Sequence, residues 1–246
     1  LLKLQTKVLN FALFSKLKYI PRMENSPPSS FPINAELFIA TGCAHCPTVM
    51  NELSKLLKEG ELSCLKITNI AVDNERASEL NIRSVPWFSL SSSISSMVFS
   101  GNYNAKEIAK WVAVSQEKEA MVEYIEAFLK EGELMTIVQA IQLSPKTFSS
   151  VINMLQDEET SIDLRIGLDA LLENFAATET LKQQTSELIK MASEDNIRLQ
   201  IDALHYLALT GDIENKTILE EKKLDKDKQI QEAAIEALDT LMDLVK

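Results

Sequence analysis

The chain has 246 residues, a hydrophobic fraction of 46% and a formal net charge of −11 at pH 7. This hydrophobic fraction supports a sizeable core and excludes a disordered chain, and the length allows one large domain or two modest ones. Nucleic acid is not an expected partner, because phosphate binding needs clustered Lys and Arg in a chain less acidic than this one. No apolar run is long enough to span a bilayer.

The first 33 residues differ from the rest in composition. Residues 1–22 are basic and apolar with no acidic residue, and a Ser/Pro-rich linker follows around residues 26–32. The segment 1–22 is similar in composition to a targeting segment, but it has no small-residue cleavage site. Met23 is the first methionine, so residues 1–22 are either a targeting segment or an appendage upstream of the natural start. A cytoplasmic location is the default expectation.

Residues 34–116 predict an α/β domain. Apolar runs predict strands at 35–40, 62–72, 85–90 and 97–99, and amphipathic periodicity predicts helices at 43–58, 74–80 and 104–114. Strands joined through a helix are expected to pair parallel, and the last two strands form an antiparallel hairpin. The expected domain therefore has a mixed sheet with helices on both faces.

Residues 117–246 have helical periodicity throughout and contain an internal repeat. Residues 164–171 match residues 197–204 after a shift of 33, and a third copy at 235–238 lies 34 residues further on. A further helical stretch precedes each copy, at 148–155, 181–191 and 217–223. Paired helices with this period predict a solenoid in which each pair packs on its neighbours.

Cys43 and Cys46 form a C-x-x-C pair between a predicted strand and a predicted helix, which is typical of a redox dithiol. A thiolate at a helix amino terminus faces backbone N–H groups and the positive end of the helix dipole, which lower the cysteine pKa. Cys43 is therefore the expected exposed nucleophile, and Cys46 the expected buried resolving thiol. His45 can stabilise the Cys43 thiolate and make the disulfide easier to reduce, or it is only an exposed residue at the helix start.

Pro86 is the second candidate site residue. It opens the third predicted strand, where a proline removes no sheet hydrogen bond and the preceding peptide bond can be cis. If its loop folds over the dithiol, the backbone of Val85 can pair with an extended substrate segment. The alternative is an ordinary proline at the entry to a strand.

The remaining chemistry-bearing residues are expected to be structural. Cys64 lies among apolar residues, and His205, the only other histidine, is expected to fill core or surface. A zinc site would need two further ligands. With no phosphate loop or dinucleotide fingerprint in the sequence, neither a metal nor a cofactor is expected.

Residues 34–115 resemble the thioredoxin superfamily, and within it the minimal glutaredoxin-like members. The resemblance rests on the motifs 43–47 (CAHCP) and 82–86 (IRSVP), in this order and spacing. It implies a nucleophilic Cys43, a resolving Cys46 and a cis bond before Pro86 that contacts substrate. The chain departs from thioredoxins in the Ala-His pair between its cysteines, in a Gly where Trp usually precedes the first cysteine, and in the absence of an acid from Leu37 to Ala40 in the strand before the dithiol.

Residues 117–246 are similar to HEAT-type repeats through the Leu-Arg and Ile-Arg pairs at 164–165 and 197–198, which implies a protein-binding surface. The predicted architecture is thus an α/β thioredoxin-like domain followed by an all-α HEAT-like repeat domain. The predicted function is thiol–disulfide exchange with a protein substrate that carries a disulfide or dithiol, with an unidentified electron donor or acceptor. The alternatives are a repeat scaffold with a redox-sensing or docking thioredoxin-like module, and a dedicated reducer of a peroxidase.

Overall fold

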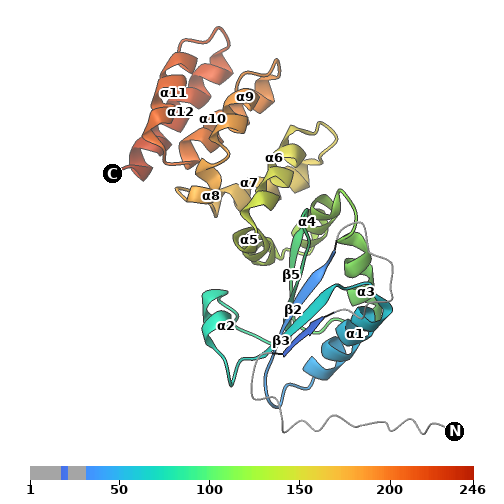
Figure 1. Ribbon diagram of the computed structural model, residues 1–246. Coiled ribbons are helices and arrows are strands. Elements are labelled where there is room, and N and C mark those ends of the chain that lie inside the picture. Colours follow the sequence, from blue (N-terminus) through green and yellow to red (C-terminus); the bar gives the residue numbers. More distant parts are fainter. Residues whose placement is uncertain (1–17, 22–31) are drawn as a thin grey trace, which may run out of the picture. The chain divides into compact units, whose positions relative to one another are not determined.

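The computed structural model describes residues 18–21 and 32–246 of the chain. The chain divides into two compact units, Leu1–Ala120 and Met121–Lys246, which are treated separately below (Figure 1). The boundary predicted from the sequence lay between residues 116 and 117. Most of the predicted basic segment and the Ser/Pro-rich linker fall outside the described residues.

The described part of the first unit contains one mixed sheet with the strand order β1-β3-β2-β4-β5. Its strands are β1 (Lys18–Pro21), β2 (Asn34–Ile39), β3 (Cys64–Asn69), β4 (Trp87–Ser91) and β5 (Ser96–Ser100). β2 and β3 pair parallel, whereas β1 pairs antiparallel with β3, and β4 pairs antiparallel with both β2 and β5. The predicted mixed sheet is confirmed.

Three helices flank this sheet, namely α1 (Cys46–Glu59), α2 (Glu75–Glu79) and α3 (Ala105–Val114). α1 and α3 lie together on one face, and α2 lies on the other (Figure 1). Between the sheet and α3 the rings of Phe88 and Phe99 stack at 4.7 Å, and Trp111 of α3 packs against Phe99 at 5.7 Å. Helices on both faces of a small mixed sheet are the arrangement expected from the sequence.

The strand β1 corrects the prediction that everything before residue 34 is an appendage outside the domain. Lys18 lies opposite Ile67 and Pro21 opposite Cys64, so these four residues extend the sheet beyond β3. A four-residue edge strand is too short for its alternation to stand out in the sequence, and its pairing partner is distant along the chain.

The third predicted strand also starts later than expected. The prediction began at residue 85, whereas β4 begins at Trp87. The Val85–Pro86 bond is cis, and Pro86 has no N–H to donate to the neighbouring strand. The residues before Trp87 therefore form a loop rather than part of the sheet.

All elements in the described second unit are helical. They are α4 (Ala120–Lys130), α5 (Leu134–Leu143), η2 (Pro145–Thr147), α6 (Phe148–Gln156), α7 (Ile162–Glu173), α8 (Glu179–Lys182), α9 (Thr185–Met191), α10 (Ile197–Leu209), η3 (Ile213–Asn215), α11 (Lys216–Lys222) and α12 (Lys228–Leu244). Successive helices contact each other as α6 with α7, α9 with α10, and α11 with α12. Across the described residues, no helix combines the length and the hydropathy that a membrane crossing requires.

The long helices α7, α10 and α12 share one burial pattern. In each, the third, seventh, tenth and eleventh helical residues are buried, namely Leu164, Leu168, Leu171 and Leu172; Leu199, Ala203, Tyr206 and Leu207; and Ile230, Ala234, Ala237 and Leu238. This spacing defines one side of an α-helix. The three helices therefore bury equivalent faces.

This pattern corrects the predicted repeat register of 33 and 34 residues. From Leu164 to Leu199 the separation is 35 residues, and from Leu199 to Ile230 it is 31. The predicted register would instead equate the exposed Ile166 with the buried Leu199. The predicted register was based on residue similarity between the two segments. Burial instead depends on how far a residue lies from the start of its helix. The N-cap residues Ser161 and Asn196 define those starts for α7 and α10.

Candidate redox site

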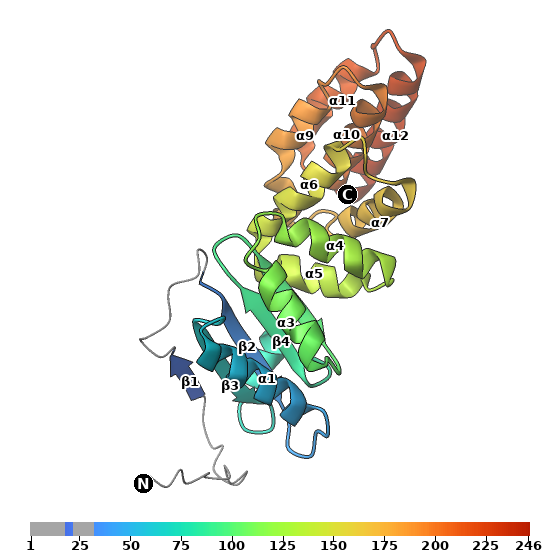
Figure 2. The same cartoon turned by 90° about the vertical axis from the view of Figure 1, so that its right-hand side faces the viewer.

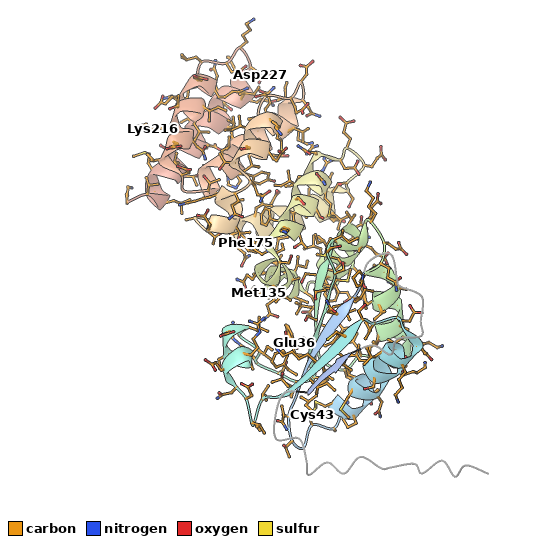
Figure 3. All side chains as sticks on the ribbon, in the orientation of Figure 1. Glu36, Cys43, Met135, Phe175, Lys216 and Asp227 are labelled. Atoms are coloured by element: carbon orange, nitrogen blue, oxygen red, sulfur yellow. A yellow bond between two sulfur atoms is a disulfide. The ribbon has the colours of Figure 1, made fainter. Side chains whose placement is uncertain are left out.

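The candidate site lies where β2 ends and α1 begins (Figure 3 labels Cys43). A turn at Thr41 and Gly42 leads out of β2, and Gly42 has a φ of 83°, which suits a residue without a side chain. The N–H of Cys43 donates to the carbonyl of Ala40 at 3.3 Å. The side-chain amide of Asn69, at the end of β3, donates to Thr41 Oγ1 at 3.4 Å. These contacts fix the turn that carries Cys43.

Cys43 and Cys46 are joined by a disulfide, with their Cα atoms 5.5 Å apart. α1 begins at Cys46, so Cys43 precedes the helix instead of opening it. Cys46 is buried, and Cys43 remains partly exposed between the exposed Gly42 and Ala44. An incoming thiol or disulfide can therefore reach the Cys43 sulfur, while the Cys46 sulfur is covered.

The backbone N–H of Cys46 donates to Cys43 Sγ at 3.1 Å. This amide belongs to the first turn of α1, whose N–H groups have no partner within the helix. The first turn contains no acidic residue, so no negative charge there offsets the helix dipole. After reduction, this donor and the helix dipole would both favour a thiolate on Cys43 over the thiol.

His45 is the N-cap residue of α1, and its side chain makes no capping hydrogen bond. The imidazole is exposed beside the disulfide. The structure thus places His45 at the helix start, where its charged form would add to the positive field at the helix amino terminus.

Val85 and Pro86 meet the dithiol although they lie far away in the sequence. The Val85 carbonyl oxygen lies 3.7 Å from Cys43 Sγ, and the Val85–Pro86 bond is cis. The loop is anchored to the end of β5, because Gly101 N–H donates to the Pro86 carbonyl at 2.9 Å. The structure therefore brings together the two sequence motifs that carry the expected chemistry.

The buried side of β2 contributes no acid beneath the dithiol. Leu37 is fully buried there, and the neighbouring Glu36 points to the opposite face of the sheet. Glu36 accepts from Lys66 Nζ at 2.7 Å and lies 4.0 Å from Arg76 Nε (Figure 3 labels Glu36). The carboxylate of Glu36 therefore connects β2, β3 and α2 rather than serving the cysteines.

Neither a metal site nor a role for Cys64 emerges from the described residues. No group of three or more His, Cys, Asp or Glu side chains in the described ranges is placed to hold a metal ion. Cys64 is buried on β3.

A pocket of about 300 Å³ in the second unit was missed by the sequence reasoning. It is lined by residues of α7, α10 and α12, namely Asp169, Glu173, Ile201, Asp202, His205, Tyr206, Ala233, Glu236 and Ala237. The prediction that His205 is a filler did not anticipate its place at this pocket. The lining residues come from helices far apart in the sequence, so no local spacing could have indicated them.

The inner part of this pocket is a hydrogen-bonded cluster. Tyr206, buried on α10, donates its hydroxyl to Asp169 on α7, and Arg198 pairs with Asp202 at 3.0 Å. Burial raises the pKa of the Asp202 carboxyl above its usual range, although Arg198 opposes the shift. Burial and the bond to Asp169 likewise raise the pKa of Tyr206, so its hydroxyl stays a donor at neutral pH.

The comparisons with known proteins add little to this geometry. No family model matches the chain, and no curated protein matches it. Among solved structures, the chain is similar to chloroplastic thioredoxin z, with 21% sequence identity and a TM-score of 0.31 over 33% of this chain and 76% of that chain. The functional case for this chain therefore rests on its own residues.

Proposed function

We propose that this chain is a thiol–disulfide oxidoreductase that uses Cys43 and Cys46 to reduce, oxidise or isomerise disulfides in protein substrates. The observation that supports it best is the 3.1 Å hydrogen bond from the Cys46 N–H to Cys43 Sγ at the start of α1. A sulfur that is partly exposed and accepts a hydrogen bond from an N–H at the start of a helix is suited to react as a thiolate.

In the reducing direction, the Cys43 thiolate attacks one sulfur of a substrate disulfide. A mixed disulfide forms, and the other substrate sulfur leaves as a thiolate that takes up a proton from solvent. Cys46 then loses its proton and attacks Cys43 Sγ, which releases the second substrate thiol and forms the Cys43–Cys46 disulfide. Two electrons pass from the dithiol to the substrate, and the reverse sequence oxidises a substrate dithiol.

The residues around the dithiol have separate roles in this proposal. Val85 offers its backbone to an extended substrate segment, and Pro86 holds that backbone beside Cys43. His45, exposed at the N-cap, stabilises the Cys43 thiolate when protonated. The exchange itself involves only sulfur atoms and protons, so the proposal includes no cofactor.

The helical unit is proposed to be a HEAT-like repeat domain that binds the protein substrate. Support comes from the shared burial pattern of α7, α10 and α12 and from the helix that precedes and contacts each of them. In this arrangement residues 34–116, extended by β1, form the redox domain and residues 117–246 form the binding domain. A cytoplasmic location stays part of the proposal.

The test is turnover by cysteine variants, measured as insulin reduction and as reduction of oxidised glutathione. Cys43→Ser is expected to abolish both activities, and Cys46→Ser is expected to accumulate a mixed disulfide with the substrate. Cys64→Ala is the matched control, because it removes a buried thiol on β3 that the proposed exchange does not use. Full activity in the Cys43→Ser protein would overturn the proposal.

The second candidate function is a repeat scaffold. In it, the thioredoxin-like module acts as a redox sensor or a docking module and has negligible turnover. Leu37 favours it, because this fully buried residue leaves its side of β2 without a carboxylate to move protons, and the Glu36 carboxylate of the same strand pairs with Lys66 instead. The Cys43 pKa separates the two candidates. A thiol that titrates near the unperturbed value of about 8.5 would favour the scaffold.

A further inference from the structure

Exposed isoleucines form an apolar face on the helical unit. Ile162 and Ile166 of α7 are 73% and 62% exposed, and Ile197 of α10 is 42% exposed. Ile162 and Ile166 are one helical turn apart and so lie on the same side of α7. Ile162 and Ile197 are the first residues of their helices and occupy equivalent positions in the shared burial pattern. The exposed side chains therefore repeat from one helix to the next.

The pocket between α7, α10 and α12 adjoins this face. α10 contacts both α7 and α12 (Figure 2). Ile201, one turn after Ile197, lines the pocket. On α7, Asp169 and Glu173 also line the pocket, and their helical spacing places them on the same side as Ile162 and Ile166. The isoleucines and the pocket thus form one continuous surface, called here the Ile–acid face.

The charge of the pocket is negative and only partly compensated. Neither Lys nor Arg is among its lining residues, whereas Asp169, Glu173, Asp202 and Glu236 are. Asp202 pairs with Arg198, and Asp169 accepts the Tyr206 hydroxyl. Glu173 and Glu236 are exposed, and in the part of the chain that the structure describes neither makes an ion pair.

Both properties of the Ile–acid face point to the same occupant. Contiguous exposed apolar side chains beside a polar rim are typical of a protein interaction surface. Unpaired carboxylates in a concavity attract a cation and repel phosphate, which disfavours nucleic acid and anionic lipid. An occupant that complements both must carry positive charge and apolar side chains together.

We propose that the Ile–acid face binds a basic, partly apolar segment of the protein substrate. A Lys or Arg side chain of that segment enters the pocket between Glu173 and Glu236, and adjacent apolar side chains cover Ile166 and Ile197. This inference rests on the proposed function, since the bound segment belongs to the substrate of the dithiol. The helical unit thereby selects substrates by charge.

The test is fluorescence anisotropy with the full oxidised chain and two labelled probes. One probe is a 12-residue peptide with Lys and Leu among Gly and Ser, and the other has Glu in place of every Lys. The Lys/Leu peptide is expected to bind at least tenfold more tightly than the Glu/Leu peptide. Glu173→Gln with Glu236→Gln is expected to weaken the binding of the Lys/Leu peptide by tenfold or more, and Ile166→Ser with Ile197→Ser to weaken it as well.

The matched control is Glu131→Gln with Glu221→Gln, which removes the same number of charges from exposed sites outside the pocket. This pair is expected to change binding less than twofold. Equal weakening by both pairs would show general attraction to an acidic chain and overturn the inference, as would no weakening by either. Turnover of the small disulfide DTNB, which needs no basic segment, is measured in parallel. If the wild-type chain turns over DTNB but does not bind the Lys/Leu peptide selectively, only this inference is overturned. If the wild-type chain does not turn over DTNB at all, the proposed function is overturned.

Discussion

The Sγ atom of Cys43 lies 3.7 Å from the carbonyl oxygen of Val85 and accepts the N–H of Cys46 at 3.1 Å. These two contacts act in opposite directions once the disulfide is reduced. A carbonyl oxygen accepts from the thiol and so favours the protonated form, whereas an N–H favours the thiolate. The N–H contact is shorter and belongs to a helix amino terminus, so we expect the thiolate to be favoured.

The first prediction follows from this balance and concerns thiol reactivity. In the reduced protein, the Cys43 pKa is expected to lie below the ordinary value of about 8.5. Iodoacetamide alkylation followed from pH 5 to 9, with the modified cysteine identified by mass spectrometry, measures it. Cys43 is expected to react first, because Cys46 and Cys64 are buried. A Cys43 that titrates at or above the ordinary value, or reacts after Cys46, would contradict the prediction.

The second prediction concerns His45. His45→Ala is expected to raise the Cys43 pKa and to make the reduction potential more negative by about 10–20 mV, because a charged imidazole stabilises the reduced form. Equilibration with glutathione buffers measures the potential. His205→Ala is the control, since His205 lies in the helical unit. If the reduction potential of the His45→Ala protein equals that of the wild type, His45 does not tune the dithiol and is only an exposed residue at the helix start.

The third prediction concerns the ion pair between Glu36 and Lys66. Glu36→Gln leaves the half-buried Lys66 without its counter-charge, whereas Arg76 keeps its ion pair with Glu79 at 3.0 Å. The substitution is expected to lower the free energy of unfolding of the first unit by about 1–2 kcal/mol. Urea unfolding followed by tryptophan fluorescence measures this unit alone, because both tryptophans of the chain lie in it.

Its control is Glu52→Gln on α1, which breaks the ion pair with the exposed Lys55 in the same unit and is expected to cost less than about 0.5 kcal/mol. A second variant, Glu36→Gln with Lys66→Met, is expected to recover part of the loss, because it removes the Lys66 charge that Glu36→Gln leaves uncompensated. If Glu36→Gln unfolds at the wild-type urea concentration, the cluster does not stabilise the first unit.

The fourth prediction concerns the pH dependence that Asp202 confers. Burial raises the folded-state pKa of Asp202 above the unfolded value of 3.8, so in this window the folded chain binds more protons than the unfolded chain. The contribution of Asp202 to the free energy of unfolding therefore decreases as the pH rises from 3.8 through the folded-state pKa. Above the folded-state pKa, the full free-energy cost of burying the charged carboxylate is present. Asp202→Asn removes this dependence.

We therefore expect Asp202→Asn to become more stable relative to wild type as the pH rises between about 4 and 7. Urea unfolding of both proteins across this range, followed by circular dichroism, gives the difference at each pH. A difference that stays constant with pH would show that Asp202 ionises equally easily in both states.

Local signals in the sequence were sufficient for most of the first unit. The C-x-x-C spacing, the helical periodicity after Cys46 and the apolar runs of β2 to β5 each depend on residues close together, and the mixed sheet followed from how such elements connect. The motif at Pro86 could also be recognised from the sequence, because proline restricts the backbone wherever it occurs. The helices of the second unit could likewise be predicted from the hydrophobic periodicity within each segment.

Only the tertiary structure decided which distant residues meet. It placed Lys18–Pro21 in the sheet, the Val85 carbonyl beside Cys43, and Glu173 and Glu236 around one pocket. The repeat register also needed it, because burial on α7, α10 and α12 depends on where each helix starts and not on which letters match. Sequence by itself thus determined the spacing of the two cysteines before a helix and the types of element, since both depend on neighbouring residues. Long-range packing decided the surroundings of the dithiol and the surface of the helical unit, because such contacts join residues that no local spacing relates.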